Sequence, residues 1–378
     1  MVRTLGIEEE LLLIDPASRM VVPGAPRVLK QFREHGRGRW GAGPATDALD
    51  QELFRHQLET RTDPTRDAGD AFAQLVTARR TAGEAARAAD LAAVACGFVP
   101  LGGERAVVTA NDRYRAMTEV FGQVAREGGT CGMHVHVAID SPEEGVGVLD
   151  RIRPWLPVLL ALSANSPFGA GRDTGYASWR SQVWSQWPSA GVTERFETLA
   201  GYREACAALI ATGAARDPGM IYFDARLSAS QPTVEIRICD VCTDAGEAIV
   251  VAALVRGLVE TAAADWAADT AAPGYRAELL RAATWRAARY GVAESLVHPV
   301  ARELRPAGEV LAALVDQVGP ALEAAGDLDR VQAGVEQAVR ASGAIRQRAA
   351  FERTGSIEGV VDDLIERTEA SWDAQDRV

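Results

Sequence analysis

The sequence predicts an α+β protein in which helices pack against a mostly antiparallel sheet. Stretches at residues 4–14, 131–139 and 232–240 alternate apolar and polar residues with the period of a β-strand. Between them lie long stretches, rich in Ala and Arg, whose apolar residues recur at helical spacing. Because no repeat, low-complexity linker or clear boundary divides the chain, we expect residues 1–378 to form one large domain.

Composition narrows the class of protein. Of the 378 residues, 47% are hydrophobic and 24% are charged, which is an ordinary globular composition. The formal net charge of −12 disfavours nucleic acid as a partner, because no basic stripe offsets it. The apolar runs are too short for a membrane span and the N-terminus lacks a signal-peptide pattern. We therefore expect a cytoplasmic protein with no membrane partner.

The few lysines and cysteines limit how the protein could bind phosphate and whether it could form disulfides. Lys30 is the only lysine, so a P-loop, which places lysine on phosphate oxygens, cannot be built. Phosphate binding would then depend on arginine and metal ions. Cys239 and Cys242 have C-x-x-C spacing, but the neighbouring Asp240 would raise the pKa of the thiols. We interpret the pair as buried thiols, and the five scattered cysteines predict no disulfide framework.

The first half of the chain is expected to mix strands and helices. The strand at residues 4–14 ends at the turn formed by Asp15 and Pro16. Residues 49–62 are expected to form one or two strand segments, and residues 94–100 a short buried strand. Helices are expected at residues 26–35, 67–95 and 111–126, the last with Asn111 as its N-cap.

The second half is expected to be mainly helical. A helix begins at Ser141 and runs to about residue 164, with kinks at its prolines. Residues 165–191 show no clear period but are rich in Trp and Arg, and a long connection of this kind is usually functional. Further elements are expected as a helix at 195–212, a strand at 221–228 forming a hairpin with 232–240, and a helix from Asp244 to about 266. From residue 273 onward every pattern is helical, so no further strand is expected.

Charged side chains share one face of several predicted strands. Period two places Glu235 and Arg237 on the same side of a strand whose other side is apolar. The same argument pairs Glu8 with Glu10, His134 with His136 and Gln57 with Glu59. It gives Glu52 the opposite parity to Glu59 unless a bulge intervenes. The inward-facing candidates are Glu8, Glu10, Glu59, His134, His136, Asp224, Arg226, Glu235 and Arg237.

This set of side chains favours a metal–nucleotide cleft. Oxygen-rich ligand sets suit Mg²⁺ or Mn²⁺ better than Zn²⁺, and several carboxylates facing one cavity cannot all ionise without cations. The arginines would then hold a transferring phosphoryl group. Two alternatives stay open, because Glu8 and Glu10 could lie on a solvated edge strand and a lone histidine is more often a satisfied core residue. Serine hydrolase, zincin and dinucleotide oxidoreductase motifs are absent from the sequence.

Seven stretches resemble the carboxylate–amine ligase branch, the YbdK-like proteins, of the glutamate–cysteine ligase family, type 2. They are GIEEE at 6–10, CGMHVHV at 131–137, NSPF at 165–168, GRDTGYAS at 171–178, RSQVW at 180–184, PTVEIR at 232–237 and RQRAAFER at 346–353. The resemblance covers nearly the whole chain. It implies a glutamine-synthetase-like fold, an antiparallel sheet that forms a funnel with helices packed outside.

The resemblance also implies a reaction. A carboxylate would attack the γ-phosphoryl group of ATP to give an acyl phosphate and ADP, and an amine would then displace phosphate to form an amide. The carboxylate would be small, with glutamate as one candidate, and the amine would be cysteine or another amino acid. Members of the family often form homodimers, so a homodimer is one expectation here.

Site residues follow from the resemblance position by position. The residues implied for Mg²⁺, or Mn²⁺, and ATP are Glu8, Glu10, Glu59, His134 and Glu235, with His136 and Glu52 less directly involved. The catalytic residues implied are Arg237, which meets the phosphoryl group, together with Arg226 and Arg180. The other nucleotide- or substrate-binding candidates are Arg172, Tyr176, Ser178, Asn165 and Asp224, with Tyr176 and Arg180 as the expected contacts of the carboxylate.

Two other functions are consistent with the same residues. One is a catalytically silent protein that binds a metal or nucleotide, and the other is a phosphotransferase acting on a guanidino compound. ADP release would separate them, because only the ligase requires both an acid and an amine.

Overall fold

The computed structural model describes residues 2–39, 49–102, 107–126 and 129–372. Its largest element is a seven-stranded sheet in which neighbouring strands are antiparallel. The strand order is β2-β3-β1-β5-β9-β8, and β4 also pairs with β1. The strands are β1 Leu5–Ile14, β2 Leu49–Gln51, β3 Gln57–Arg61, β4 Ala92–Val94, β5 Gly132–Ala138, β8 Ala225–Leu227 and β9 Thr233–Asp240.

Strand β1 lies inside the sheet, and one of its faces is buried along its whole length. Leu5, Ile7 and Leu11 are buried on that face. Glu9 lies on the same face and is fully buried. Arg79 of helix α2 (Ala68–Arg87) donates to both of its carboxylate oxygens, at 2.6 and 2.8 Å. A buried carboxylate is tolerated only when it is paired in this way. Glu8 and Glu10 are thereby left on the opposite face.

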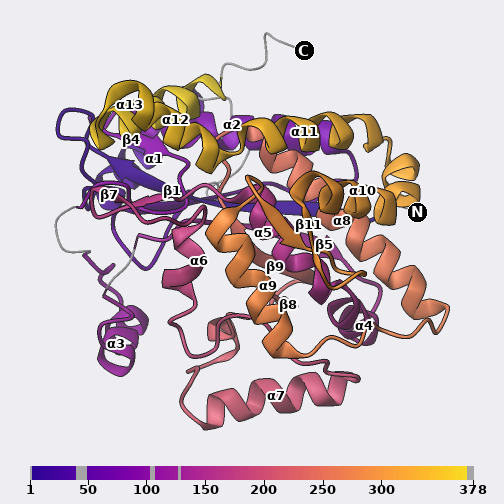
Figure 1. The fold of residues 1–378 in the computed structure, drawn as a ribbon. Coiled ribbons are helices and arrows are strands. Elements are labelled where there is room, and N and C mark those ends of the chain that lie inside the picture. The colour runs from indigo at the N-terminus through magenta and orange to yellow at the C-terminus, as the bar shows by residue number, and fades with distance from the viewer. Residues whose placement is uncertain (1, 40–48, 103–106, 127–128, 373–378) are drawn as a thin grey trace.

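Helices pack around this sheet. Helices α11, α12 and α13 lie on one side of β1, and α3 and α7 lie on the opposite side (Figure 1). The largest apolar core lies between strands β5 and β9 and helices that include α4, α5 and α8. The helices are α1 Ala25–Arg39, α2 Ala68–Arg87, α3 Asp112–Phe121, α4 Pro142–Ile152, η1 Arg153–Trp155, α5 Leu156–Ser163, α6 Trp179–Trp184, α7 Leu199–Ala211, η2 Pro218–Met220, α8 Ala245–Ala267, α9 Ala277–Tyr290, α10 Ala307–Ala325, α11 Leu328–Ala341, α12 Gly343–Thr354 and α13 Ile357–Ala370.

The predicted fold class, α+β with an antiparallel sheet and helices outside, is confirmed. The predicted N-caps are also confirmed, since Asn111, Ser141 and Asp244 accept hydrogen bonds from backbone N–H groups in the first turns of α3, α4 and α8. The helix expected at 67–95 is shorter and is followed by β4. The helix expected from Ser141 is divided by the 3₁₀ turn η1, because proline removes a donor and crowds the preceding turn.

Two expectations about strands and loops were wrong. Residues 165–191 are not structureless, since they contain the hairpin β6 (Phe168–Gly169) and β7 (Arg172–Asp173) as well as α6. A second small hairpin, β10 (Ser295–Val297) with β11 (Leu304–Pro306), follows residue 273, where no strand was expected. Strands of two or three residues are too short to show a periodic pattern, which explains both errors.

Strand β9 departs from period two at a bulge. Met133 pairs with Cys239 and Val135 pairs with Ile236, so β9 has one extra residue between these pairs. The bulge moves Cys239 from the expected polar face into the apolar core. Burial raises the pKa of the Cys239 thiol to about 12 and that of Cys242 well above its ordinary value. Both cysteines are free, as the interpretation of buried thiols predicted.

No helix in the described part of the chain is both long and apolar enough to cross a membrane.

Candidate active site

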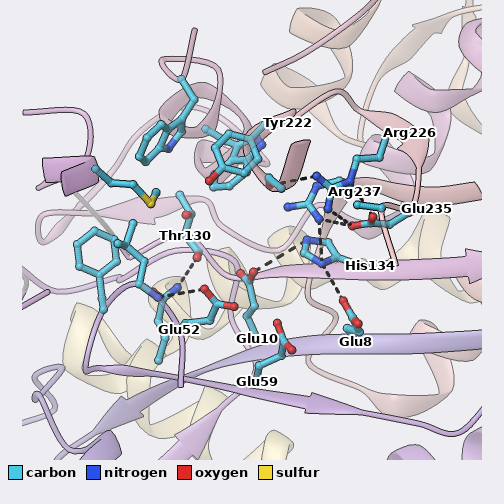
Figure 2. Close-up of a pocket in the computed structure, with 18 of the residues that line it drawn as sticks. Glu8, Glu10, Glu52, Glu59, Thr130, His134, Tyr222, Arg226, Glu235 and Arg237 are labelled. Carbon is cyan, nitrogen blue, oxygen red and sulfur yellow. Dashed lines mark hydrogen bonds and ion pairs between the residues drawn. The ribbon is translucent and has the colours of Figure 1, made fainter. Parts of the chain in front are cut away.

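The register of the sheet brings the predicted charged residues into one row. Glu10 lies opposite Glu59, and Glu8 lies opposite His134. Farther across the sheet His136 lies opposite Glu235, and Glu235 lies opposite Arg226. Side chains that face each other across antiparallel strands are near neighbours. Five strands therefore present these side chains on one face of the sheet, where Figure 2 shows them converging.

A cleft of about 380 Å³ lies over this row. Strands β3, β1, β5 and β9 form its floor, and side chains from α3, α6 and the segment before β8 form its walls. The residues lining it are Glu8, Glu10, Glu52, Leu53, Phe54, Gln57, Glu59, Arg113, Tyr114, Met117, Val124, Thr130, His134, His136, Val183, Trp184, Trp187, Gly219, Tyr222, Arg226, Ser228, Ala229, Ser230, Glu235 and Arg237.

One end of the cleft is acidic. Burial and the adjacent charge of Glu52 raise the pKa of Glu10 to about 7. Burial and the carboxylates of Glu52 and Glu8 raise the pKa of Glu59 well above its ordinary value. Like charges held close together in a partly desolvated cleft oppose each other's ionisation. This end is therefore an environment in which a bound cation would favour the ionised carboxylates.

Glu8 differs from its acidic neighbours because two histidines contact it. Its Oε2 atom lies 3.4 Å from Nδ1 of His134 and 3.6 Å from Nε2 of His136. Burial alone would raise the pKa of Glu8, but hydrogen bonds with the two histidines outweigh it and lower the pKa. Burial and the charge of Arg237 lower the pKa of His134 to about 4. His134 is thus neutral at neutral pH, the form in which a ring nitrogen can accept a hydrogen bond or bind a metal.

The other end of the cleft is built around Glu235. Arg226 donates to both carboxylate oxygens, at 2.7 and 3.2 Å, and Arg237 donates to one of them. Burial raises the pKa of Glu235, but the two guanidinium groups outweigh burial and lower it. The guanidinium group of Arg237 also lies 3.5 Å from Nδ1 of His134. Arg237 therefore stands between the acidic end and the Arg226–Glu235 pair, as Figure 2 shows.

An aromatic cluster forms one wall beside Arg237. The ring of Tyr222 lies 4.8 Å from that of Trp184 and 5.4 Å from that of Trp187, centroid to centroid. The guanidinium carbon of Arg237 lies 5.8 Å from the Tyr222 ring. The aromatic content of residues 165–191 had pointed to Trp184 and Trp187. Tyr222 was not singled out, and its place in the strand expected at 221–228 was the only signal available.

Glu52 is the clearest residue of the cleft that strand parity misplaced. It lies after β2 and before β3, outside both strands. The turn between them lets the backbone change direction, so the parity that relates Gln57 to Glu59 does not extend back to Glu52. Arg113 and Tyr114 of α3 were also missed, because nothing in a short helix predicts which part of a sheet it will cover.

Six of the predicted site residues lie outside the lining of the cleft. Asn165 and Ser178 are buried around the carboxylate of Asp240, and Arg180 is buried against the carbonyl groups of β9. Asp224 lines a separate small cavity with Arg153, and burial raises its pKa to about 7. Arg172 is exposed on β7, and Tyr176 packs against Trp179. Direct contact with substrate stays a prediction for these six residues, and their placement does not support it.

The donor set of the cleft fits a hard divalent cation that is shared with a ligand. Among the described residues no three His, Cys, Asp or Glu side chains form a ready metal-binding group. Mg²⁺, however, usually binds through one or two carboxylates and completes its coordination with water and substrate phosphates. Glu8, Glu10, Glu52 and Glu59 supply such carboxylates around an open cleft.

Comparisons with known proteins identify relatives of the whole chain. A model described as Glutamate-cysteine ligase family 2 (GCS2) matches residues 4–367. A Nocardioides sp. protein named "Putative glutamate--cysteine ligase 2-1" is 69% identical over 376 residues, which cover 100% of this chain and 98% of that protein. A relative from Streptomyces coelicolor, with the same name but without the final number, is 45% identical over 98% of this chain and 100% of its own length.

Two solved structures share the fold. A bifunctional glutathione synthetase from Pasteurella multocida has a TM-score of 0.69 at 15% identity, covering 99% of this chain and 53% of that chain. A glutamate–cysteine ligase from Francisella tularensis in complex with AMP has a TM-score of 0.65 at 14% identity, covering 99% of this chain and 90% of that chain. At these identities the likeness concerns the fold, which is glutamine-synthetase-like as the sequence predicted.

Proposed function

We propose that this chain, which belongs to glutamate–cysteine ligase family 2, joins a small carboxylate to a small amine through an acyl phosphate formed from ATP. The chain is an ATP-dependent carbon–nitrogen ligase, and the proposal concerns the route, the ions and the residues. One observation carries it. A single cleft holds four glutamates at one end and the Arg226–Glu235–Arg237 group at the other.

The acidic end is the proposed site of magnesium and the phosphates of ATP. Glu8, Glu10 and Glu59 would hold Mg²⁺ or Mn²⁺ together with His134, and Glu52 faces the same space. When bound, the ion would neutralise charge on the nucleotide phosphates. Repulsion among these carboxylates, seen in the raised pKa values of Glu10 and Glu59, supports this assignment because a cation would relieve it.

Arg237 is the proposed contact of the transferring phosphoryl group. It is buried, and Glu235 and His134 hold its guanidinium group at the floor of the cleft. Its donors would face the phosphoryl oxygens as negative charge develops there, which lowers the barrier because the donors need no reorganisation. Glu235 was predicted as a metal ligand. Its contacts with two arginines support a role in orienting Arg237.

The substrates are proposed from the names of the relatives and from the chemistry. Glutamate and cysteine, or another amino acid as the amine, are the first candidates. A homodimer also stays a proposal. A guanidino phosphotransferase and a silent nucleotide-binding protein are the alternatives that the experiment must separate.

ADP release with panels of acids and amines tests the proposal. We expect ADP only when ATP, Mg²⁺, an acid and an amine are all present, with an amide detected by mass spectrometry. Replacing the amine with hydroxylamine should trap the acyl phosphate as a hydroxamate. Phosphoryl transfer to a guanidino compound without an amide would instead support the phosphotransferase, and nucleotide binding without turnover would support the silent protein.

A further inference from the structure

The bulge in β9 lies at the residue that faces the phosphoryl group. Arg237 and Ile238 together stand opposite a single residue of β5, His134, because the pairs on either side are Val135 with Ile236 and Met133 with Cys239. A bulge changes the direction of a side chain and disrupts the backbone hydrogen bonds of the ladder. Backbone groups freed in a buried strand need other partners.

Arg180 provides these partners. Its Nη2 atom donates to the carbonyl oxygen of Arg237 at 3.1 Å, and its Nη1 atom donates to that of Ile238 at 3.2 Å. The planar guanidinium group can reach two adjacent carbonyls at once, which a lysine ammonium cannot do with the same geometry. Arg180 therefore holds the two residues that form the bulge.

Asp240, at the end of the same strand, fixes Arg180 from behind. It is fully buried, and one of its oxygens lies 3.8 Å from Nη1 of Arg180. Its carboxylate accepts hydrogen bonds from the Ser166 hydroxyl at 2.7 Å, the Ser178 hydroxyl at 2.8 Å and the Asn165 backbone N–H at 2.9 Å. Asn165, Ser178 and Arg180, which the sequence predicted to contact ligand, thus belong to one buried polar network around Asp240.

The guanidinium group of Arg180 fits only because residue 132 is a glycine. A Cβ atom on Gly132 would lie 2.3 Å from Nη2 of Arg180, so any side chain there would displace the guanidinium group. Gly132 begins β5, two residues before His134, and its N–H donates to Glu10 at 2.7 Å. The guanidinium group is buried and is not among the groups that line the cleft, and it lies 5.8 Å from the ring of Trp184, which does line it.

We propose that Arg180 is a positioning residue that holds the β9 bulge and thereby directs Arg237 at the phosphoryl group. Arg180 does not touch substrate. This inference rests on the proposed function, because it assigns Arg180 a role through Arg237. A displacement of about 1 Å at a reacting group can cost about 10²-fold in rate, so loss of this support should reduce kcat.

The test compares two buried arginines. Arg180→Lys keeps the positive charge near Glu10 but removes the two-carbonyl contact, and we expect kcat to fall by roughly 10- to 100-fold. The KM of the carboxylate and the Kd of Mg²⁺–ATP should stay at wild-type values. Arg256→Lys is the matched control, since Arg256 is equally buried and binds Asp327 and a backbone carbonyl far from the cleft. It should lose comparable thermal stability and keep its kcat.

A double variant separates positioning from independent contact. If Arg180 acts through Arg237, the variant Arg180→Lys, Arg237→Lys should be no slower than Arg237→Lys alone, whereas independent roles would multiply the losses. Asp240→Asn, which keeps the side-chain shape, should give a smaller loss of kcat with unchanged KM.

The outcomes distinguish this inference from the proposed function. A wild-type enzyme that forms no amide, or an Arg237→Lys variant with wild-type kcat, would contradict the proposed function. With those two results as expected, a raised KM for the carboxylate in Arg180→Lys, an unchanged kcat, or multiplied losses in the double variant would overturn the positioning role alone.

Discussion

The two faces of strand β1 carry the same kind of side chain in opposite circumstances. Glu9 is fully buried and both of its oxygens are bound by Arg79. Glu8 and Glu10, one residue to each side, face the acidic end of the cleft, where two more glutamates lie. A carboxylate with its own buried partner stabilises the fold, whereas carboxylates that repel one another around a cleft indicate a site for a cation.

The largest expected effect is a loss of stability on the buried face of β1. Glu9→Gln should destabilise the protein by about 3–5 kcal/mol, because it leaves the buried charge of Arg79 without its counter-ion. Arg79 also donates to the carbonyls of Cys242 and Thr243, so the loss spreads to the start of α8. Chemical denaturation measures the change.

Glu8→Gln is the matched control for that variant, since it makes the same substitution on the other face of the same strand. It should keep most of the stability and weaken Mg²⁺–ATP binding, measured by calorimetry. Equal destabilisation by both variants would break the distinction between the two faces.

The next effect concerns catalysis. Arg237→Lys should lower kcat by about 10²-fold, or about 2.7 kcal/mol of transition-state stabilisation, while nucleotide affinity changes little. Lysine keeps the charge but not the fork of donors that contacts Glu235 and that we propose faces the phosphoryl group. Steady-state kinetics and a nucleotide titration measure the two quantities. A variant that lost affinity but kept kcat would place Arg237 with the ground-state binding residues.

A smaller effect is a pH dependence set by Glu10. Its pKa in the fold is raised to about 7, above its value in the unfolded chain. The unfolded chain therefore releases this proton at lower pH, so without metal the contribution of Glu10 to stability declines as pH rises from the ordinary carboxyl range to about 7. If Glu10 is a ligand as proposed, Mg²⁺ would bind its ionised form, so addition of Mg²⁺ should raise Tm more at pH 8 than at pH 6.

Differential scanning fluorimetry with and without Mg²⁺ checks this, and Glu10→Gln is the control that should remove much of the pH dependence. A Mg²⁺ effect on Tm that is equal at both pH values would argue against Glu10 as a ligand.

The smallest effect tests the residue that parity misplaced. Glu52→Gln removes one of the repelling charges, so the metal-free protein should gain about 1–2 °C in Tm. The same variant should bind Mg²⁺–ATP more weakly, because one negative charge is lost from the acidic end. We therefore expect Tm without metal to rise while the affinity for Mg²⁺–ATP falls. A lower Tm without metal would show that Glu52 has a stabilising partner in the fold.

Local sequence was sufficient for much of the site. Alternation along β1, β5 and β9 predicted that Glu8, Glu10, His134, Glu235 and Arg237 share a face, because the side of a sheet on which a residue lies depends only on its neighbours in the strand. The α+β class followed from the same patterns. Helix starts at Asn111, Ser141 and Asp244 were readable because an N-cap bonds to its own first turn.

Tertiary structure alone decided the rest. Glu52 enters the cleft through a turn, and Cys239 leaves the polar face at a bulge, since neither register nor bulge is encoded in the period of one strand. Arg180, in helix α6, binds a carbonyl of β9 that lies 57 residues later in the chain. Asn165 and Ser178 bind Asp240 across sequence separations of 75 and 62 residues. Local sequence was enough to predict which residues carry charge and which face of a strand they occupy. Whether a charge faces a buried partner, a backbone carbonyl or an open cleft was decided only when distant segments packed together.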